Sequence, residues 1–231
     1  FVKPLNLIEI TKIISKTSNV YYKFTIVDGW QEFQFNKYSN EIFDEKIKLD
    51  YHETFADTYH YISTDSLKKL VNLMKINKNL FFLNYSNNEL IKKYTINEIM
   101  IIASLVEKEG IDDFDKKIIS SVLLNRLDIK MKLQIDASTI FSITKGQFKF
   151  DRKLTYKDLK IKDQYNTYYI NGLPPKPICF VSRKTIEIVL ENYRSDYLFY
   201  FYDKNLNKHL YSKSFKEHKE KLFDYRKKNA K

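Results

Sequence analysis

TINEIMIIASLVEKEG, residues 95–110, is the stretch around which we expect the rest of the chain to fold. Thr95 and Glu98 have the spacing of a capping box, in which each side chain accepts a hydrogen bond from a free backbone N–H at the helix start. Gly110 predicts the end of the same helix, because glycine adopts the left-handed conformation of a C-cap without steric cost. Between these positions apolar residues cover most of the helix circumference, which is typical of a buried helix.

Two carboxylates, Glu107 and Glu109, fall in the last turn of this predicted helix. The helix dipole and burial both raise the pKa of a carboxylate at a helix C-terminus. A carboxylic acid that stays protonated can donate a proton, as cleavage of a glycosidic bond requires. The two residues lie about 200° apart around the helix axis, so only one can face a given cleft, and helix geometry leaves the choice open. The alternative is a helix end in water, where Lys108 balances both charges.

The composition is that of a folded domain with a diffuse positive charge. The 231 residues suffice for one large domain or two small ones, and 43% hydrophobic and 16% aromatic residues are ample for a packed core. The net charge of +11 leaves nucleic acid and anionic surfaces open as partners. The lysines are spread along the whole chain, however, so the charge is weak support for any partner.

The sequence gives no indication of a metal or cofactor. Cys179 is the only cysteine, so neither an intrachain disulfide nor a cysteine metal cluster can form, and the four histidines lack zinc spacings.

No apolar run approaches the roughly 20 residues of a membrane span. Because the chain begins at Phe1, we expect a fragment from which an N-terminal anchor or signal has been removed.

The remaining pattern predicts helices with few strands, an α+β fold. Residues 51–63 and 128–180 show no regular hydrophobic period. The helix expected over residues 113–127 has a predicted core stripe that includes Phe114. The expected helices are residues 5–16, 30–38, 66–76, 113–127 and 182–192, with another opening at Ser214; the expected strands are residues 20–27, 197–203 and 209–212.

Five separate motifs, in order, resemble those of the endolytic murein transglycosylases, the MltG or YceG-like family. They are ASLVEKEG, NRL, MKLQIDAST, YNTYYINGLPPKPI and the tail HLYS…SFKEH. The resemblance implies a mixed helix and sheet catalytic domain over residues 51–231, preceded over residues 1–50 by part of a small LysM-like α/β subdomain. It also implies a bacterial inner-membrane protein with a single N-terminal anchor and the enzyme outside the cytoplasm.

The chemistry that the resemblance implies is cleavage, without water, of the β-1,4 bond between N-acetylmuramic acid and N-acetylglucosamine in nascent peptidoglycan strands. The family's catalytic glutamate falls on Glu107, the first of the pair. Glu107 would protonate the leaving oxygen and then take the proton of the muramic 6-hydroxyl, which gives a 1,6-anhydro end.

The other expected site residues belong to substrate binding. Gln134 and Asp136 would organise the cleft, and Asn125 and Arg126 would steady a loop or meet a substrate carboxylate. The glycan groove would be lined by Tyr165, Asn166, Thr167 and Tyr168, unless the tyrosines of this segment are core residues. Ala137 and Lys176 depart from the family pattern, which has proline and glycine there.

Several alternatives stay open at this stage. A muramidase-like hydrolase would use Glu107 with Asp136 and leave reducing ends. A catalytically silent scaffold would bind glycan or peptidoglycan synthases, and a basic nucleic-acid-binding protein is less favoured because no nucleic-acid motif is present. Peptidoglycan strands are the expected partner, with synthases as a further one.

Overall fold

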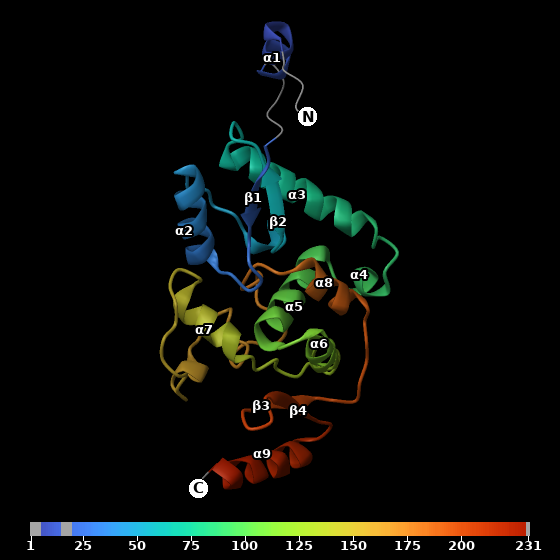
Figure 1. Cartoon of the computed structure of the whole chain (residues 1–231). Helices are drawn as coiled ribbons and strands as arrows, with labels where there is room; N and C mark the ends of the chain where they lie inside the picture. The colour runs from blue at the N-terminus through green and yellow to red at the C-terminus, as the bar shows by residue number, and fades with distance from the viewer. Residues whose placement is uncertain (1–5, 15–19, 230–231) are drawn as a thin grey trace.

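The computed structural model describes residues 6–14 and 20–229, and its centre is helix α5 (Ile96–Glu109), as the sequence predicts. The capping box is confirmed: Thr95 accepts from the backbone N–H of Glu98, whose carboxylate accepts from that of Thr95. Every residue of α5 from 99 to 106 is buried. Helices α6 (Asp113–Asp128) and α8 (Arg183–Leu190) pack against α5 and against each other (Figure 1).

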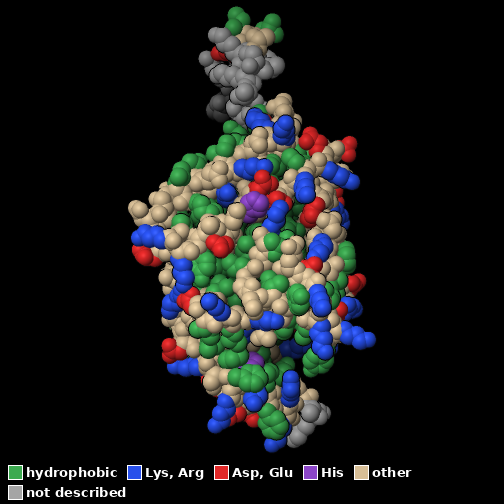
Figure 2. Space-filling model, turned by 180° about the vertical axis from the view of Figure 1, so that it is seen from behind, with side chains coloured by type: hydrophobic (Ala, Val, Ile, Leu, Met, Phe, Trp, Pro, Cys, Tyr) green, Lys and Arg blue, Asp and Glu red, His purple; other side chains and the backbone are tan. Residues whose placement is uncertain are grey.

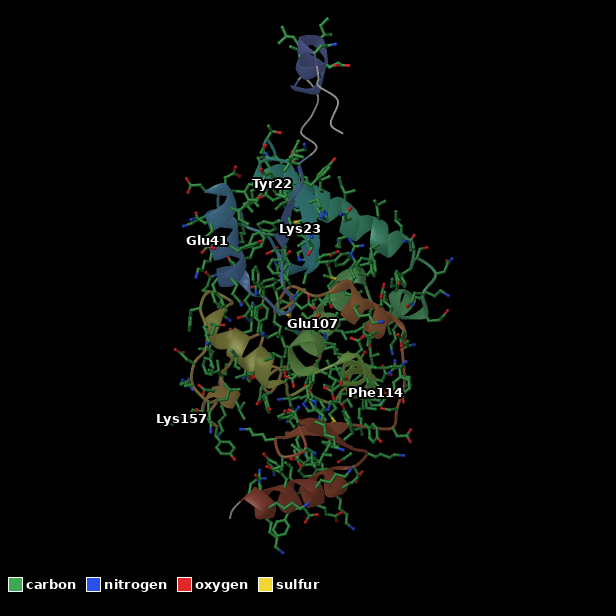
Figure 3. All side chains as sticks on the ribbon, in the orientation of Figure 1. Tyr22, Lys23, Glu41, Glu107, Phe114 and Lys157 are labelled. Carbon is green, nitrogen blue, oxygen red and sulfur yellow. The ribbon has the colours of Figure 1, made fainter. Side chains whose placement is uncertain are left out.

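The ends of α6 and α8 also follow the sequence. Asp112 caps α6 by accepting from the backbone N–H of Asp115, and Ser182 caps α8 by accepting from that of Thr185. The expected core position of Phe114 is wrong, since this residue is 72% exposed. Phe114 is labelled in Figure 3. Asp115 takes the inward position of that first turn, where its carboxylate accepts several hydrogen bonds.

A two-stranded antiparallel sheet joins the N-terminal segment to the rest of the chain. Strand β1 (Tyr22–Thr25) pairs with β2 (Thr58–Tyr61), and Phe24 of β1 lies in the same hydrophobic core as α5. The two strands therefore lie on opposite sides of the domain boundary predicted near residue 50. Helices α2 (Glu32–Phe43) and α3 (Leu67–Leu83) flank this sheet (Figure 1).

The second sheet is the predicted hairpin near the C-terminus. Strand β3 (Phe199–Asp203) pairs with β4 (Lys208–Ser212), and α9 (Phe215–Asn229) packs against both strands. This hairpin and α9 lie beyond α6, at the end of the molecule opposite β1 and β2 (Figure 1).

Several short helices complete the α+β fold. The sequence pattern predicts α1 but not α4 or α7, and residues 5, 15 and 16 of the predicted first helix lie outside the described residues. The bounds are α1 (Leu7–Ile14), η1 (Tyr51–Glu53), α4 (Glu89–Lys93), α7 (Asp136–Thr144) and η2 (Asp158–Lys160).

Gly110 ends α5 for a different reason from the one predicted. Its φ of −78° and ψ of 140° are extended, so the expectation of a left-handed C-cap is wrong. A Cβ at this position would overlap the side chain of Lys116 and lie 3.1 Å from its Cα. Glycine is therefore needed here because it lets the first turns of α6 approach the end of α5.

The described surface carries its charges in a mixed arrangement. Lysine and arginine side chains are spread over the face in Figure 2, with acidic side chains among them. Within the described ranges, no helix combines the length and the apolar character needed to cross a membrane.

Candidate active site

A cavity of about 300 Å³ lies beside the C-terminal end of α5, and Glu109 lines it. We call it the Glu109 cavity. It is formed by the end of α5, the start of α7, the loop after residue 160 and the β3–β4 hairpin. Its lining residues are Glu109, Arg126, Gln134, Asp136, Tyr168, Tyr200, Phe201, Tyr202 and His209.

Glu109 is a partly exposed carboxylate whose surroundings favour its protonated form. Burial raises the pKa of Glu109 above its usual value, and the nearby charge of Asp136 raises it further. The Tyr200 hydroxyl donates a hydrogen bond to Glu109 Oε2 at 3.1 Å, and the backbone N–H of Ala137 also donates to the Glu109 carboxylate. Both hydrogen bonds lower the pKa and so oppose the effect of burial. Because the net pKa is raised, Glu109 is a candidate general acid by the physical criteria for such a group.

Glu107 has an entirely different environment, since it points toward α6 and α8 (Figure 3). Its Oε1 accepts a hydrogen bond and ion pair from Lys116, and its Oε2 accepts from the backbone N–H and hydroxyl of Ser182 at 3.0 and 2.9 Å. The Glu107 side chain is only 3% exposed, and it does not line the Glu109 cavity. Both of its oxygens are therefore committed to holding three helices together.

Asp136 lies at the N-terminal turn of α7 and faces the same cavity as Glu109. Its Oδ1 accepts from the Tyr168 hydroxyl at 2.7 Å, so the carboxylate is oriented within the cavity. Gln134 also lines the cavity and adopts a positive φ of 52°. Of the residues predicted for the cleft, Gln134, Asp136 and Tyr168 are thus brought together with Glu109.

Asn166 and Thr167 are fully buried, which contradicts the expectation that they line a groove. The Asn166 amide donates to two backbone carbonyls, and its Oδ1 accepts from the Thr139 hydroxyl. The Thr167 hydroxyl accepts from the backbone N–H of Ile135 at 2.8 Å. These bonds fix the loop that presents Tyr168 to the start of α7.

The other three predicted residues also have structural contacts. Tyr165 packs on Phe141 at the edge of the core, in agreement with the alternative that the tyrosines of this segment are core residues. The Asn125 amide donates to two carbonyls of residues 195–197. Arg126 lines the Glu109 cavity, but its guanidinium donates to the carbonyls of residues 198 and 133 and is 5% exposed.

The pattern of the sequence does not predict the contribution of the hairpin. Tyr200 and His209 line the Glu109 cavity from paired strands, and burial raises the pKa of Tyr200, so its hydroxyl remains a donor. His209 Nδ1 lies 2.8 Å from Asp115 Oδ2, which joins the hairpin to the start of α6. The four consecutive aromatic residues of β3 are the available signal, but they also fit a strand that only packs against its neighbours.

A second and larger cavity, of about 430 Å³, borders the same helix ends, the end of α5 and the start of α7. We call it the lysine cavity. Lys108 and Ala137, which line it, are the chain neighbours of Glu109 and Asp136 in the Glu109 cavity. The lining residues are Gln31, Phe33, Gln34, Lys108, Ala137, Ile140, Lys149 and Phe150.

Two relatives of known name match most of this chain. An endolytic murein transglycosylase of Bacillus subtilis (strain 168) is 34% identical over 182 residues, which are 78% of this chain and 49% of the relative. One of Streptococcus pneumoniae (strain ATCC BAA-255 / R6) is 32% identical over 167 residues, which are 71% of this chain and 30% of the relative. The chain thus spans about half the length of the first relative and under a third of the second.

The fold has a known counterpart as well. The crystal structure of a YceG-like protein from Listeria monocytogenes matches with a TM-score of 0.72 at 24% identity, over 86% of this chain and 75% of that one. At this identity the likeness establishes the shared fold alone. A model of the YceG-like family matches residues 1–223 of the sequence. The chain therefore belongs to the YceG-like family.

Proposed function

We propose that this chain is the catalytic part of an endolytic peptidoglycan transglycosylase. The observation that carries the proposal is a carboxyl group with a raised pKa, Glu109, in a cavity that also holds a second carboxylate and several aromatic side chains. Aromatic faces and hydroxyl groups suit sugar rings. The names of the two relatives support the same reaction.

We assign the role of general acid to Glu109 rather than to Glu107, which the sequence resemblance favours. A general acid must be within hydrogen-bond reach of the bond that it protonates. The Glu107 oxygens are occupied by Lys116 and Ser182, and its side chain is almost inaccessible. Glu109 borders open space, and its surroundings favour the protonated form.

The reaction needs one carboxyl group and no water. Glu109 donates its proton to the glycosidic oxygen as the bond between this oxygen and C1 of N-acetylmuramic acid breaks. The resulting carboxylate accepts the proton of the muramic 6-hydroxyl while that oxygen bonds to C1. The products are a 1,6-anhydro end and a free 4-hydroxyl on N-acetylglucosamine, and Glu109 regains its proton.

Asp136 gives this cavity a second possible chemistry. Its charge is close enough to raise the pKa of Glu109, and an ionised carboxylate there would stabilise positive charge developing on C1. A hydrolase would use Asp136 as a nucleophile or to activate water, and would leave reducing ends. The hydrogen bond from the Tyr168 hydroxyl to Asp136 supports a role for Asp136 in organising the cleft rather than as a nucleophile.

The ends of the product strands test this proposal. The 231-residue chain is incubated with uncrosslinked peptidoglycan strands, and new ends are identified by mass spectrometry. We expect 1,6-anhydro ends, whereas reducing ends would establish the hydrolase with Asp136. Binding without new ends would support the scaffold. A membrane anchor preceding this chain, the bacterial inner membrane as its location and synthases as partners remain proposals from the resemblance.

A further inference from the structure

The lysine cavity is the largest of the described cavities, and the proposed reaction does not use it. Its walls are held by hydrogen bonds between distant segments. The backbone N–H of Phe33 donates to the carbonyl of Gly146 at 3.0 Å, and Gln147 Nε2 donates to the Glu32 carboxylate at 2.6 Å. These bonds fasten the loop after α7 to the start of α2, so the cavity is preformed.

The cavity has two cations, Lys108 and Lys149. Among the described residues, neither Lys108 nor Lys149 has a carboxylate within ion-pair distance. Lys108 Nζ donates to the carbonyl of Gly29, at 3.3 Å. The first turns of α2 and α7 also border the cavity, and helix N-termini add positive potential.

The rest of the lining combines apolar side chains with the amides of Gln31 and Gln34. Phe33, Phe150 and Ile140 contribute to the same space as the two lysines. A small inorganic anion would leave these surfaces without contacts, whereas a peptide with a terminal carboxylate would use both kinds of surface.

The lysine cavity and the Glu109 cavity border the same two helix ends, the end of α5 and the start of α7. Lys108 and Glu109 are adjacent on α5, and Asp136 and Ala137 are adjacent on α7, yet each pair is divided between the two cavities. A substrate whose sugar lies against Glu109 would therefore direct a substituent of that sugar over the end of α5 into the lysine cavity.

We propose that the lysine cavity binds the peptide substituent of N-acetylmuramic acid, with Lys108 and Lys149 pairing with a carboxylate of that peptide. This inference rests on the proposed function, because it assumes that a peptidoglycan strand occupies the Glu109 cavity. The chain then selects strands that carry peptides, and the lysines increase affinity rather than take part in bond cleavage.

The test compares two ligands with one chain. Short soluble glycan strands that retain their peptides, and the same strands after an amidase has removed them, are titrated by calorimetry into the Glu109→Gln chain, which should not cleave them. We expect the peptide-bearing strands to bind about tenfold more tightly, the effect of one or two partly exposed charged hydrogen bonds. This preference should shrink as ionic strength rises.

Lys108→Met with Lys149→Met, in the same background, should reduce the preference to less than about threefold. Lys68→Met is the matched control, since Lys68 is exposed on α3 and borders none of the described cavities. Equal affinity of the parent chain for both ligands would overturn the inference, as would an equal loss for both ligands in the double variant. Failure of the unaltered chain to cleave either strand would instead count against the proposed function, and the binding preference could still be measured.

Discussion

Replacing Lys116 with methionine should destabilise the fold by about 3 kcal/mol, because it leaves the Glu107 carboxylate buried without its cation. Removing one partner of a buried pair costs about 3–5 kcal/mol. The lower end applies here, since Glu107 keeps two hydrogen bonds from Ser182. The substitution also removes the bond from Lys116 to the Thr185 hydroxyl, which spans 2.9 Å.

Urea unfolding at neutral pH measures this cost, and thermal unfolding should show a midpoint lower by about 6–12 °C. Lys213→Met is the matched control: Lys213 pairs with Asp196 at 2.8 Å, but both side chains are well exposed, so no measurable change is expected. Adding Glu107→Leu to Lys116→Met should recover much of the loss, since an apolar pair avoids the buried charge. A cost for Lys116→Met as small as that of the control would refute a structural role for Glu107.

Three further outcomes follow from the geometry. Gly110→Ala should lower the free energy of unfolding in urea by about 1–3 kcal/mol, because the new Cβ would overlap Lys116. Gly172→Ala should cost about 1 kcal/mol from backbone conformation alone, since Gly172 has a φ of 78° and no atom near the position of the new Cβ. A larger loss at Gly172 than at Gly110 would contradict this reasoning. Burial opposes ionisation of Asp115, but hydrogen bonds from the hairpin outweigh this effect and lower the pKa of Asp115. Asp115→Asn should therefore destabilise the chain at pH 7, and the loss of unfolding free energy should fade as the pH drops below 3.8. An equal loss of unfolding free energy at pH 7 and pH 3 would contradict this prediction. The raised pKa of Glu109 means that ionisation of this carboxyl group destabilises the fold. Glu109→Gln should therefore increase the free energy of unfolding more at pH 7 than at pH 4. An equal gain at both pH values would count against the raised pKa.

The sequence predicts those parts of the fold that depend on local signals. The caps at Thr95, Asp112 and Ser182 each act within three residues, and all three helices begin where expected. The sequence does not predict helix α7, because its N-cap residue, Ile135, has no side-chain acceptor. The polar side chains of Asn166 and Thr167 suggest an exposed groove, but they satisfy buried backbone groups that no local pattern reveals.

The choice between the two glutamates depends on contacts between distant residues. Lys116 and Ser182 occupy Glu107 from α6 and from the start of α8, the latter 75 residues away in the chain. Tyr200 reaches Glu109 from a strand 91 residues away. Helix geometry predicts only that the two carboxylates diverge, and the packing of these three elements decides which of them meets the cavity.

The identity of the general acid is tested most directly by comparing the product ends of three chains on uncrosslinked peptidoglycan strands. The unaltered chain, Glu109→Gln and Glu107→Gln are each checked for a folded state by circular dichroism at the assay temperature. We predict new 1,6-anhydro ends from the unaltered chain and from folded Glu107→Gln, and none from Glu109→Gln. Anhydro ends that persist in Glu109→Gln and vanish in folded Glu107→Gln would contradict the assignment of the acid to Glu109.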